Sequence, residues 1–158
     1  MADKKTVYKR NIVKQFYFAQ SLSCADLCDK MDKSLPLVTK LINELMEEGK
    51  VIETGLAPST GGRRPLMYSI KPDILYIVAV SMDQLVTRIA LMDMHNNYVG
   101  EIHKIDLPLA NNVQALSILT EAIDSFIQKS GVEIHKIAGI GIAMPGFIDV
   151  QKGVNYSF

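Results

Sequence analysis

The sequence lacks any apolar run long enough to cross a lipid bilayer. Its longest runs, such as residues 137–142, are short, whereas a membrane-spanning helix needs about 20 apolar residues. The amino-terminal residues are polar and charged, without the apolar segment of a secretory signal peptide. These absences argue against a membrane protein and predict a cytoplasmic one.

Cysteine is scarce as well. Cys24 and Cys28 lie four residues apart on a predicted helix, and the histidines are scattered: His95, His103 and His135. A metal site needs several ligands close together, so these residues predict no metal. We interpret the cysteines as small, buried apolar side chains in a reducing compartment.

A net charge of one sign is also missing, but the total of zero hides an uneven distribution. Residues 1–71 carry twelve Lys or Arg and eight Asp or Glu, which gives +4, and residues 72–158 carry five and nine, which gives −4. Lys71-Pro72-Asp73 interrupts the pattern between them. We therefore predict two domains, 1–71 and 72–158, with different partners; the basic one suits nucleic acid.

The first segment is rich in helical signals. Apolar side chains recur at helical spacing from about residue 6 to 20: Tyr8, Ile12, Val13 and Phe16. Ser23 is a favourable N-cap for a second helix from Cys24 to about Met31. After a short turn, Ser34 is the expected N-cap of a third helix that Gly49 ends as a C-cap.

The third helix is predicted to bury one face and expose the other. Its apolar residues repeat at i, i+3, i+4 and i+7, which indicates a buried stripe: Val38, Leu41, Ile42 and Leu45. Pro36 falls in the first turn, where its missing N–H costs nothing. The opposite face suits a major groove, with Thr39 and Lys40 for phosphates or bases, Asn43 for an adenine edge, and Leu35 or Pro36 for thymine methyl groups. An ordinary solvated helix face is the alternative.

Two predicted strands follow the third helix directly, at residues 51–54 and 66–70. The loop between them contains Gly61-Gly62-Arg63-Arg64-Pro65, in which paired glycines permit close backbone approach and the arginines suit phosphates or a narrow minor groove. A solvated basic turn is the alternative. A helix-turn-helix followed by a β-hairpin is a winged helix, so residues 1–71 predict a DNA-binding domain.

These motifs resemble the amino-terminal domain of the ROK family, which groups bacterial repressors of sugar metabolism with sugar kinases. The resemblance rests on Leu22-Ser23, residues 35–45, Glu48-Gly49-Lys50-Val51 and the Gly-Gly-Arg-Arg-Pro loop, over nearly all of residues 8–70. One departure is the Ser-Leu-Pro-Leu start of the third helix, so no operator sequence carries over. The predicted DNA contacts are Ser23, Ser34, Leu35, Pro36, Thr39, Lys40, Asn43, Gly61, Gly62, Arg63 and Arg64.

The second segment predicts a three-stranded meander, a helix and a buried strand. The strands are expected at residues 74–82, 85–94 and 98–107, and the helix between Asn111-Asn112 as N-caps and Gly131. The buried strand is expected at residues 137–143. Its two glycines do not form a dinucleotide-binding fingerprint, because the third glycine is absent and they lie inside a strand.

This order resembles the first half of the ROK sugar-binding domain, an actin-like ATPase fold related to ribonuclease H. The match is closest over residues 139–146, followed by Asp149 and Gly153. Kinase members carry an Asp-x-Gly-Gly-Thr loop that binds ATP phosphates; here Ser81, Asp83, Gln84 and Leu85 stand in those places. The loop has lost its glycines and threonine, and Asp83 would repel a phosphate, so we expect no ATP use and no catalytic residue.

The resemblance also implies a second lobe that this sequence does not contain. The family's catalytic Asn-Asp pair, its Glu and His sugar contacts and its Cys-rich zinc cluster would lie beyond Phe158, so no cofactor is expected within the chain. Pro145 and Gly146 are the candidate effector-binding residues that remain. Either the full product is longer or the chain is a fragment, and we expect uncovered apolar surface that favours dimerisation.

Together these patterns predict a transcriptional regulator that binds operator DNA as a homodimer or higher oligomer. The resemblance implies a repressor of carbohydrate-metabolism genes that a sugar or sugar phosphate releases. One alternative is a ROK-type sugar kinase with an added amino-terminal domain, which the lost phosphate loop disfavours. Another is a protein–protein interaction module, which the arginines and the polar helix face disfavour.

Overall fold

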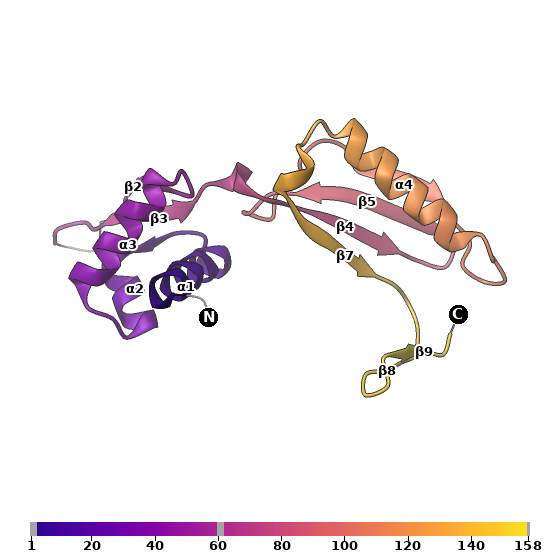
Figure 1. Cartoon of the computed structure of the whole chain (residues 1–158), viewed down its shortest axis with the longest axis horizontal. Helices are drawn as coiled ribbons and strands as arrows, with labels where there is room; N and C mark the ends of the chain where they lie inside the picture. The colour runs from indigo at the N-terminus through magenta and orange to yellow at the C-terminus, as the bar shows by residue number, and fades with distance from the viewer. Residues whose placement is uncertain (1–2, 60–61, 158) are drawn as a thin grey trace. The chain divides into compact units, whose positions relative to one another are not determined.

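The computed structural model describes residues 3–59 and 62–157. The chain forms two compact units, the first ending at Ile74 and the second beginning at Leu75 (Figure 1). The sequence places the boundary before Pro72, whereas the short helix η1 (Pro72–Ile74) lies within the first unit. In the described part of the chain, no helix combines the length and apolar character needed to span a membrane.

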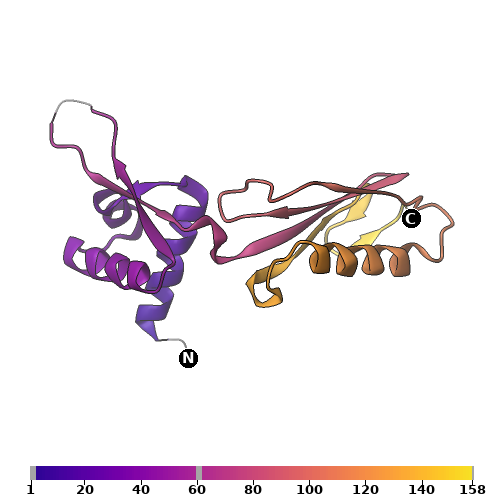
Figure 2. The same ribbon diagram turned by 90° about the horizontal axis from the view of Figure 1, so that it is seen from above.

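The first unit consists of three helices and a small antiparallel sheet. In chain order its elements are α1 (Lys4–Ala19), β1 (Leu22–Ser23), α2 (Cys24–Met31), α3 (Leu35–Glu47), β2 (Val51–Leu56) and β3 (Leu66–Ile70). Strand β3 lies between β1 and β2 in the sheet. The two arms of the β2–β3 hairpin extend away from the helices (Figure 2).

Helix α1 supplies the largest side chain of the first unit's core. Ile12 and Phe16, one turn apart, are completely buried, while Tyr8 and Val13 are half-buried. The spacing of four residues puts them on one face, as the sequence predicts. The helix begins two residues earlier than expected and ends at Ala19, because Gln20 at the C-cap has φ of 64°, which is not helical.

Helix α2 starts with a capping box. The Ser23 hydroxyl accepts a hydrogen bond from the Asp26 N–H at 3.2 Å, and the Asp26 carboxylate accepts one from the Ser23 N–H at 2.8 Å. The Ser23 hydroxyl also donates to that carboxylate at 2.7 Å. These bonds satisfy donors that a helix start otherwise leaves without partners, and they hold the pKa of Asp26 below its usual value, the Ser23 hydroxyl contributing most.

Replacing Ser23 with alanine should lower the free energy of unfolding by about 1 kcal/mol, because the cap is lost. The pKa of Asp26 should rise part of the way to normal, since the Ser23 N–H still donates. A lowered carboxyl pKa stabilises the fold above the unfolded pKa of about 3.9, and this stability disappears as pH falls through the folded pKa. The stability gap between wild type and variant should therefore narrow in acid.

Denaturant unfolding at several pH values and NMR titration of Asp26 measure both effects. Asp29→Ala, an exposed change on the same helix, serves as the control. A variant with unaltered Asp26 titration would show that the capping box does not form.

Helix α3 confirms the predicted stripe, because Val38, Leu41, Ile42 and Leu45 are all buried. Its carboxyl end is closed as the sequence indicates. Gly49, with φ of 68°, donates to Met46 O at 2.9 Å, and the Lys50 N–H donates to Leu45 O at 2.8 Å, which is the Schellman arrangement. At the other end Ser34 has N-cap backbone geometry but no capping hydrogen bond from its side chain.

The β2–β3 hairpin is anchored at its base and irregular toward its loop. Val51 pairs with Ile70, and both side chains are buried. The register shifts between Glu53 and Gly55, where Gly55 has φ of 101°, a value that favours glycine. The Ser69 hydroxyl donates to Gln20 O at 2.5 Å, which joins the hairpin to the end of α1.

The second unit is a four-stranded sheet with one helix on one face (Figure 1). Its main elements are β4 (Tyr76–Met82), β5 (Val86–Met92), β6 (His103–Asp106), α4 (Ala115–Lys129), η2 (Ile134–Lys136) and β7 (Ile137–Ala143). The order across the sheet is β6-β5-β4-β7; β7 runs parallel to β4, and the other neighbours are antiparallel. A two-stranded hairpin follows, β8 (Ile148–Asp149) and β9 (Val154–Asn155).

The core of this unit lies between α4 and the two central strands. Its buried members are Val78, Val80, Ile89, Leu91, Leu107, Leu119 and Ile123. Alternate residues of β4 and β5 supply one face of the sheet, and α4 supplies residues four apart. Of the helix stripe that the sequence predicts, Leu119 and Ile123 are buried and Phe126 and Ile127 pack against the core, whereas Leu116 is exposed.

Three sequence predictions about this unit are wrong in detail. Asn111 and Asn112 do not cap α4, which has Gln114 at its N-cap; the Asn112 side chain instead accepts from the Gln114 N–H at 3.1 Å in the preceding turn. The third strand is shorter than expected, with a single bridge from Tyr98 to Met92 before β6. Gly100, with φ of 76°, separates the two pairings.

The third error concerns β7, which is a strand but is not buried. Ile140 and Ile142 are 49% and 53% exposed. They pair with the buried Val78 and Val80 of β4, so they belong to the same sheet face as the core. Because β7 is an edge strand of this sheet, Ile140 and Ile142 are left half-exposed by the described residues of the unit, whereas Ile137 at the start of β7 packs against the core.

Candidate nucleic-acid interface

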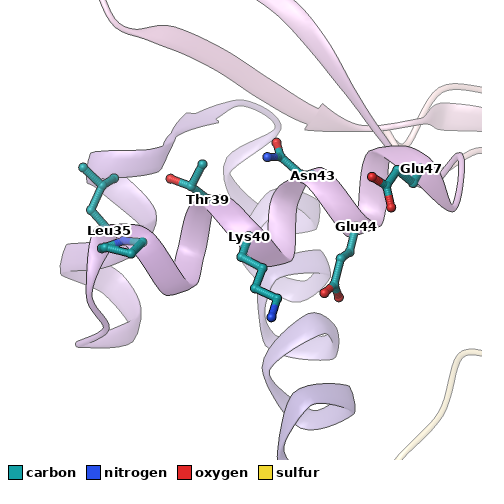
Figure 3. Close-up of a pocket in the computed structure, with 7 residues that line it drawn as sticks. Leu35, Thr39, Lys40, Asn43, Glu44 and Glu47 are labelled. Atoms are coloured by element: carbon teal, nitrogen blue, oxygen red, sulfur yellow. The ribbon is translucent and has the colours of Figure 1, made fainter.

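The exposed face of α3 carries the predicted base-contacting residues together. They line a shallow hollow of about 710 Å³ (Figure 3), formed by Leu35, Pro36, Thr39, Lys40, Asn43, Glu44 and Glu47. These residues share one face of the helix, since each has another member of the group three or four positions away. Sequence reasoning missed the two glutamates, although the same spacing extends from Asn43 to Glu47.

The side chains on this face differ in their exposure and in whether they already have a partner within the protein. Leu35 is 54% exposed, and Lys40 and Asn43 are also exposed. Thr39 is half-buried, and its hydroxyl donates to the Cys24 sulfur at 4.0 Å, a long and weak contact. Exposed amide and ammonium groups can bond base edges and phosphates directly.

Ser23 is placed differently from the prediction. It is only 3% exposed, and its hydroxyl is committed to the capping box of α2, so it offers no group at the surface. Ser34 is exposed at the start of α3, beside Leu35. Short hydroxyl side chains serve both as helix caps and as phosphate contacts, so residue type alone does not separate the two roles.

The hairpin loop presents free positive charge. Gly62, Arg63 and Arg64 are exposed, and in residues 3–59 and 62–157 no carboxylate pairs with either guanidinium. Gly62 has φ of 134°, which a residue with a side chain rarely adopts. The Ala57 N–H donates to Pro65 O at 3.0 Å and holds the two arms together. Gly61 lies outside the described residues.

The carboxyl end of α3 is acidic, and lysines from elsewhere neutralise it. Glu44 forms ion pairs of 2.7 Å with both Lys5 and Lys9 of α1, and Glu48 pairs with Lys9 and with Lys50. Hydrogen bonds from Lys50 and then Lys9 lower the pKa of Glu48 to about 2, those from Lys5 and Lys9 lower the pKa of Glu44, and the pKa of Lys9 is raised.

This network of ion pairs neutralises the negative charge at the carboxyl end of α3. Glutamates at the carboxyl end of a helix oppose its dipole, and α3 has no basic residue in its last turn. The lysines that pair with Glu44 and Glu48 offset the repulsion between these glutamates and the helix dipole, and they supply the positive charge that the last turn of α3 lacks. They also keep Glu44, which borders the exposed face, from acting as an unscreened negative charge there.

In the second unit, the turn between β4 and β5, which the sequence resemblance aligns with a phosphate loop, is occupied by its own carboxylate. Asp83 Oδ1 accepts hydrogen bonds from the Leu85 N–H at 2.9 Å and the Val86 N–H at 2.7 Å, and Arg88 lies 3.2 Å from Oδ2. The backbone hydrogen bonds, that of Leu85 first, hold the pKa of Asp83 below its usual value. Backbone N–H groups of this turn are thus already occupied by an anionic group.

The candidate effector residues Pro145 and Gly146 lie in a loop that is held by a hydrogen bond from Asn155. Asn155 donates from Nδ2 to Pro145 O at 3.0 Å. A Cβ added to Gly146, whose φ is 145°, would lie 2.2 Å from the Asn155 side chain, so the loop requires glycine there. Among the described residues, no group of three or more His, Cys, Asp or Glu side chains could hold a metal ion; Cys24 and Cys28 are free and half-buried rather than fully buried.

Comparison with known proteins relates nearly the whole chain to bacterial repressors. It is 27% identical over 153 residues to the xylose repressor of Caldicellulosiruptor bescii and 26% identical over 155 residues to that of Bacillus subtilis. These matches cover 94% and 97% of this chain. It is also 27% identical over 116 residues to the Escherichia coli transcriptional dual regulator NagC, which covers 73% of this chain. No protein-family model matches the sequence.

A solved structure supports the same relationship at the level of the fold. A ROK family transcriptional regulator described as a homologue of the E. coli Mlc protein superposes with a TM-score of 0.58 at 19% identity, over 85% of this chain and 34% of its own. The resemblance to ROK family repressors is therefore confirmed. The chain spans 37% and 40% of the two xylose repressors and 28% of NagC, which is less than half of each.

Proposed function

We propose that this chain is the DNA-binding part, with the beginning of the effector domain, of a ROK-type transcriptional repressor of carbohydrate-metabolism genes. The observation that carries the proposal is the first unit's combination of an exposed polar helix face with a hairpin loop bearing two unpaired arginines. Base contacts specify a site, and phosphate contacts hold the protein on it. The names of the relatives support the carbohydrate link.

The arrangement of elements supports a winged helix-turn-helix in the first unit. Helices α2 and α3 are joined by a short turn, and β2 and β3 follow as the wing. In such a domain the second helix of the pair enters the major groove. We assign α3 to that role and the Arg63-Arg64 loop to the adjacent phosphates or minor groove.

We assign the second unit to the first part of a ribonuclease H-like lobe, and its strand order and directions support this assignment. Three antiparallel strands, a helix and a parallel fourth strand beside the first make up this topology. In the proposed protein, a sugar or sugar phosphate acts through this domain. It biases a homodimer between arrangements that do and do not fit an operator with half-sites spaced by about one turn of DNA.

A ROK-type sugar kinase has less support. Its phosphate loop would need backbone N–H groups free to bind ATP, and Asp83 already accepts from two of them. The relatives with curated names are repressors or a transcriptional regulator.

Asn43→Ala should change which operator is preferred, by about 1–3 kcal/mol at one base pair, because an asparagine that bonds an adenine edge discriminates against other bases. Binding selection from a random duplex pool, followed by affinity measurements on the selected sites, would test this. Lys40→Ala provides the comparison, since loss of a phosphate contact lowers affinity evenly. An even loss for Asn43→Ala too would make Asn43 a backbone contact.

The proposed function is tested by a gel shift of the purified chain on the DNA upstream of its own gene, with and without xylose, N-acetylglucosamine and their phosphates. We expect a shifted complex that an excess of unrelated DNA does not abolish. Binding no stronger than to unrelated DNA would refute a sequence-specific regulator.

A further inference from the structure

A second hollow, of about 280 Å³, lies beside the exposed face of α3. It is bounded by the first turns of α1 and by α3, and its polar lining consists of Asp3, Lys4, Lys5, Tyr8 and Lys40. Lys40 lines this hollow and the larger one on α3 as well. Through Lys40, the surface assigned to DNA on α3 adjoins the amino-terminal turns of α1.

The charge around this hollow is mostly positive and partly uncompensated. The Lys33 ammonium lies 5.7 Å from the centre of the Tyr8 ring, so it joins Lys4 and Lys40 around the same aromatic side chain. Lys5 is engaged by Glu44. Within the described residues Lys4, Lys33 and Lys40 form no ion pair, and Asp3 is the carboxylate that lines the hollow.

Helix α1 adds to the positive potential. Its first turn contains no acidic residue and begins with two lysines, although the amino end of a helix carries partial positive charge and favours anions. Apart from the carboxylate of Asp3 at the N-cap, this charge arrangement is unfavourable for the isolated helix. An anion bound between Lys4, Lys33 and Lys40 would relieve it.

We propose that Lys4, Lys33 and Lys40, gathered around Tyr8, form a second phosphate-binding surface that holds the DNA backbone next to the groove entered by α3. The proposal rests on the proposed function. It adds contacts from α1 and from the α2–α3 turn to those of α3 and the hairpin loop. DNA is favoured over other anionic partners because Lys40 belongs to both hollows.

The test uses the whole chain and a long random-sequence duplex, since phosphate contacts do not depend on base sequence. Fluorescence anisotropy measures affinity over a series of salt concentrations. For the variant Lys4→Gln/Lys33→Gln, we expect the slope of log K against log salt to fall by about 1.8, with affinity roughly 10- to 50-fold lower near 0.1 M salt, because about 0.9 of slope accompanies each phosphate contact.

The matched control is Lys14→Gln/Lys104→Gln, which removes the same charge from exposed lysines that line neither hollow. It should leave the slope near that of wild type. A Lys4/Lys33 variant that behaves like wild type, or no differently from this control, would overturn the proposal. Circular dichroism melts of each variant confirm that folding is retained.

The same series separates this inference from the proposed function. If Arg63→Ala/Arg64→Ala weakens binding and the Lys4/Lys33 variant does not, the DNA-binding function stands and the second surface is refuted. If the wild-type chain binds no duplex even at low salt, the proposed function itself fails.

Discussion

Arg63→Ala/Arg64→Ala is expected to bind every duplex roughly 100-fold more weakly near 0.1 M salt, with the salt slope lower by about 1.8. Both arginines are exposed in the hairpin loop and unpaired with any carboxylate of the described chain. Both guanidinium groups can therefore bind phosphates without first breaking an ion pair within the described chain. Anisotropy titrations on operator and random duplexes at several salt concentrations measure the effect.

A charge-preserving variant tells how the arginines act. Arg63→Lys/Arg64→Lys should keep the salt slope, because lysine also neutralises phosphates. It should lose affinity for sites with a narrow minor groove if the guanidinium groups are inserted there. Wild-type affinity and slope in the alanine variant would exclude the loop from the interface.

Phe16→Ala is expected to lower the free energy of unfolding by about 3–5 kcal/mol, which is a large part of the stability of a small domain. Phe16 is completely buried in the first unit, so its removal leaves a cavity and loses the transfer free energy of an aromatic ring. Loss of DNA binding should accompany the loss of folding. Denaturant unfolding, followed by a signal from the first unit, measures the change.

Phe18→Ala is the matched control, since it removes the same side chain two residues away. Phe18 is 74% exposed and meets only the edge of Tyr17 among ring contacts in the described residues. We expect a small cost and intact DNA binding. Equal destabilisation by the two variants would mean that α1 does not pack through the face described above.

The first unit was largely predictable because its signals are local. Ser23 begins α2 and Gly49 ends α3 through hydrogen bonds within a few residues, and the stripe from Val38 to Leu45 needs only the helical period. Burial of β7 was not predictable in this way. Apolar side chains in residues 137–142 indicate a strand that can be covered, but whether a neighbour covers it depends on elements remote in sequence.

In the candidate site, too, the features set by local sequence were predictable, and those set by contacts between distant residues were not. The α3 face and the arginine loop follow from spacing and residue type, whereas the pairing of Lys9 with Glu48 joins residues 39 positions apart. No periodicity within one helix reveals such a contact. Ser23 shows a different limit: a short hydroxyl residue before a helix suits both a cap and a phosphate contact, and only its burial distinguishes them.

The Asp83 turn determines how readily a phosphate-binding site could be introduced between β4 and β5. Its carboxylate accepts hydrogen bonds from the Leu85 and Val86 N–H groups and from Arg88, so replacing Asp83 with glycine would remove these hydrogen bonds from the β4–β5 connection. The first substitution toward a phosphate loop thus carries a loss of stability before any nucleotide is bound. Further substitutions would have to follow before nucleotide binding could offset that loss, so the internal carboxylate makes a phosphate site difficult to build one residue at a time.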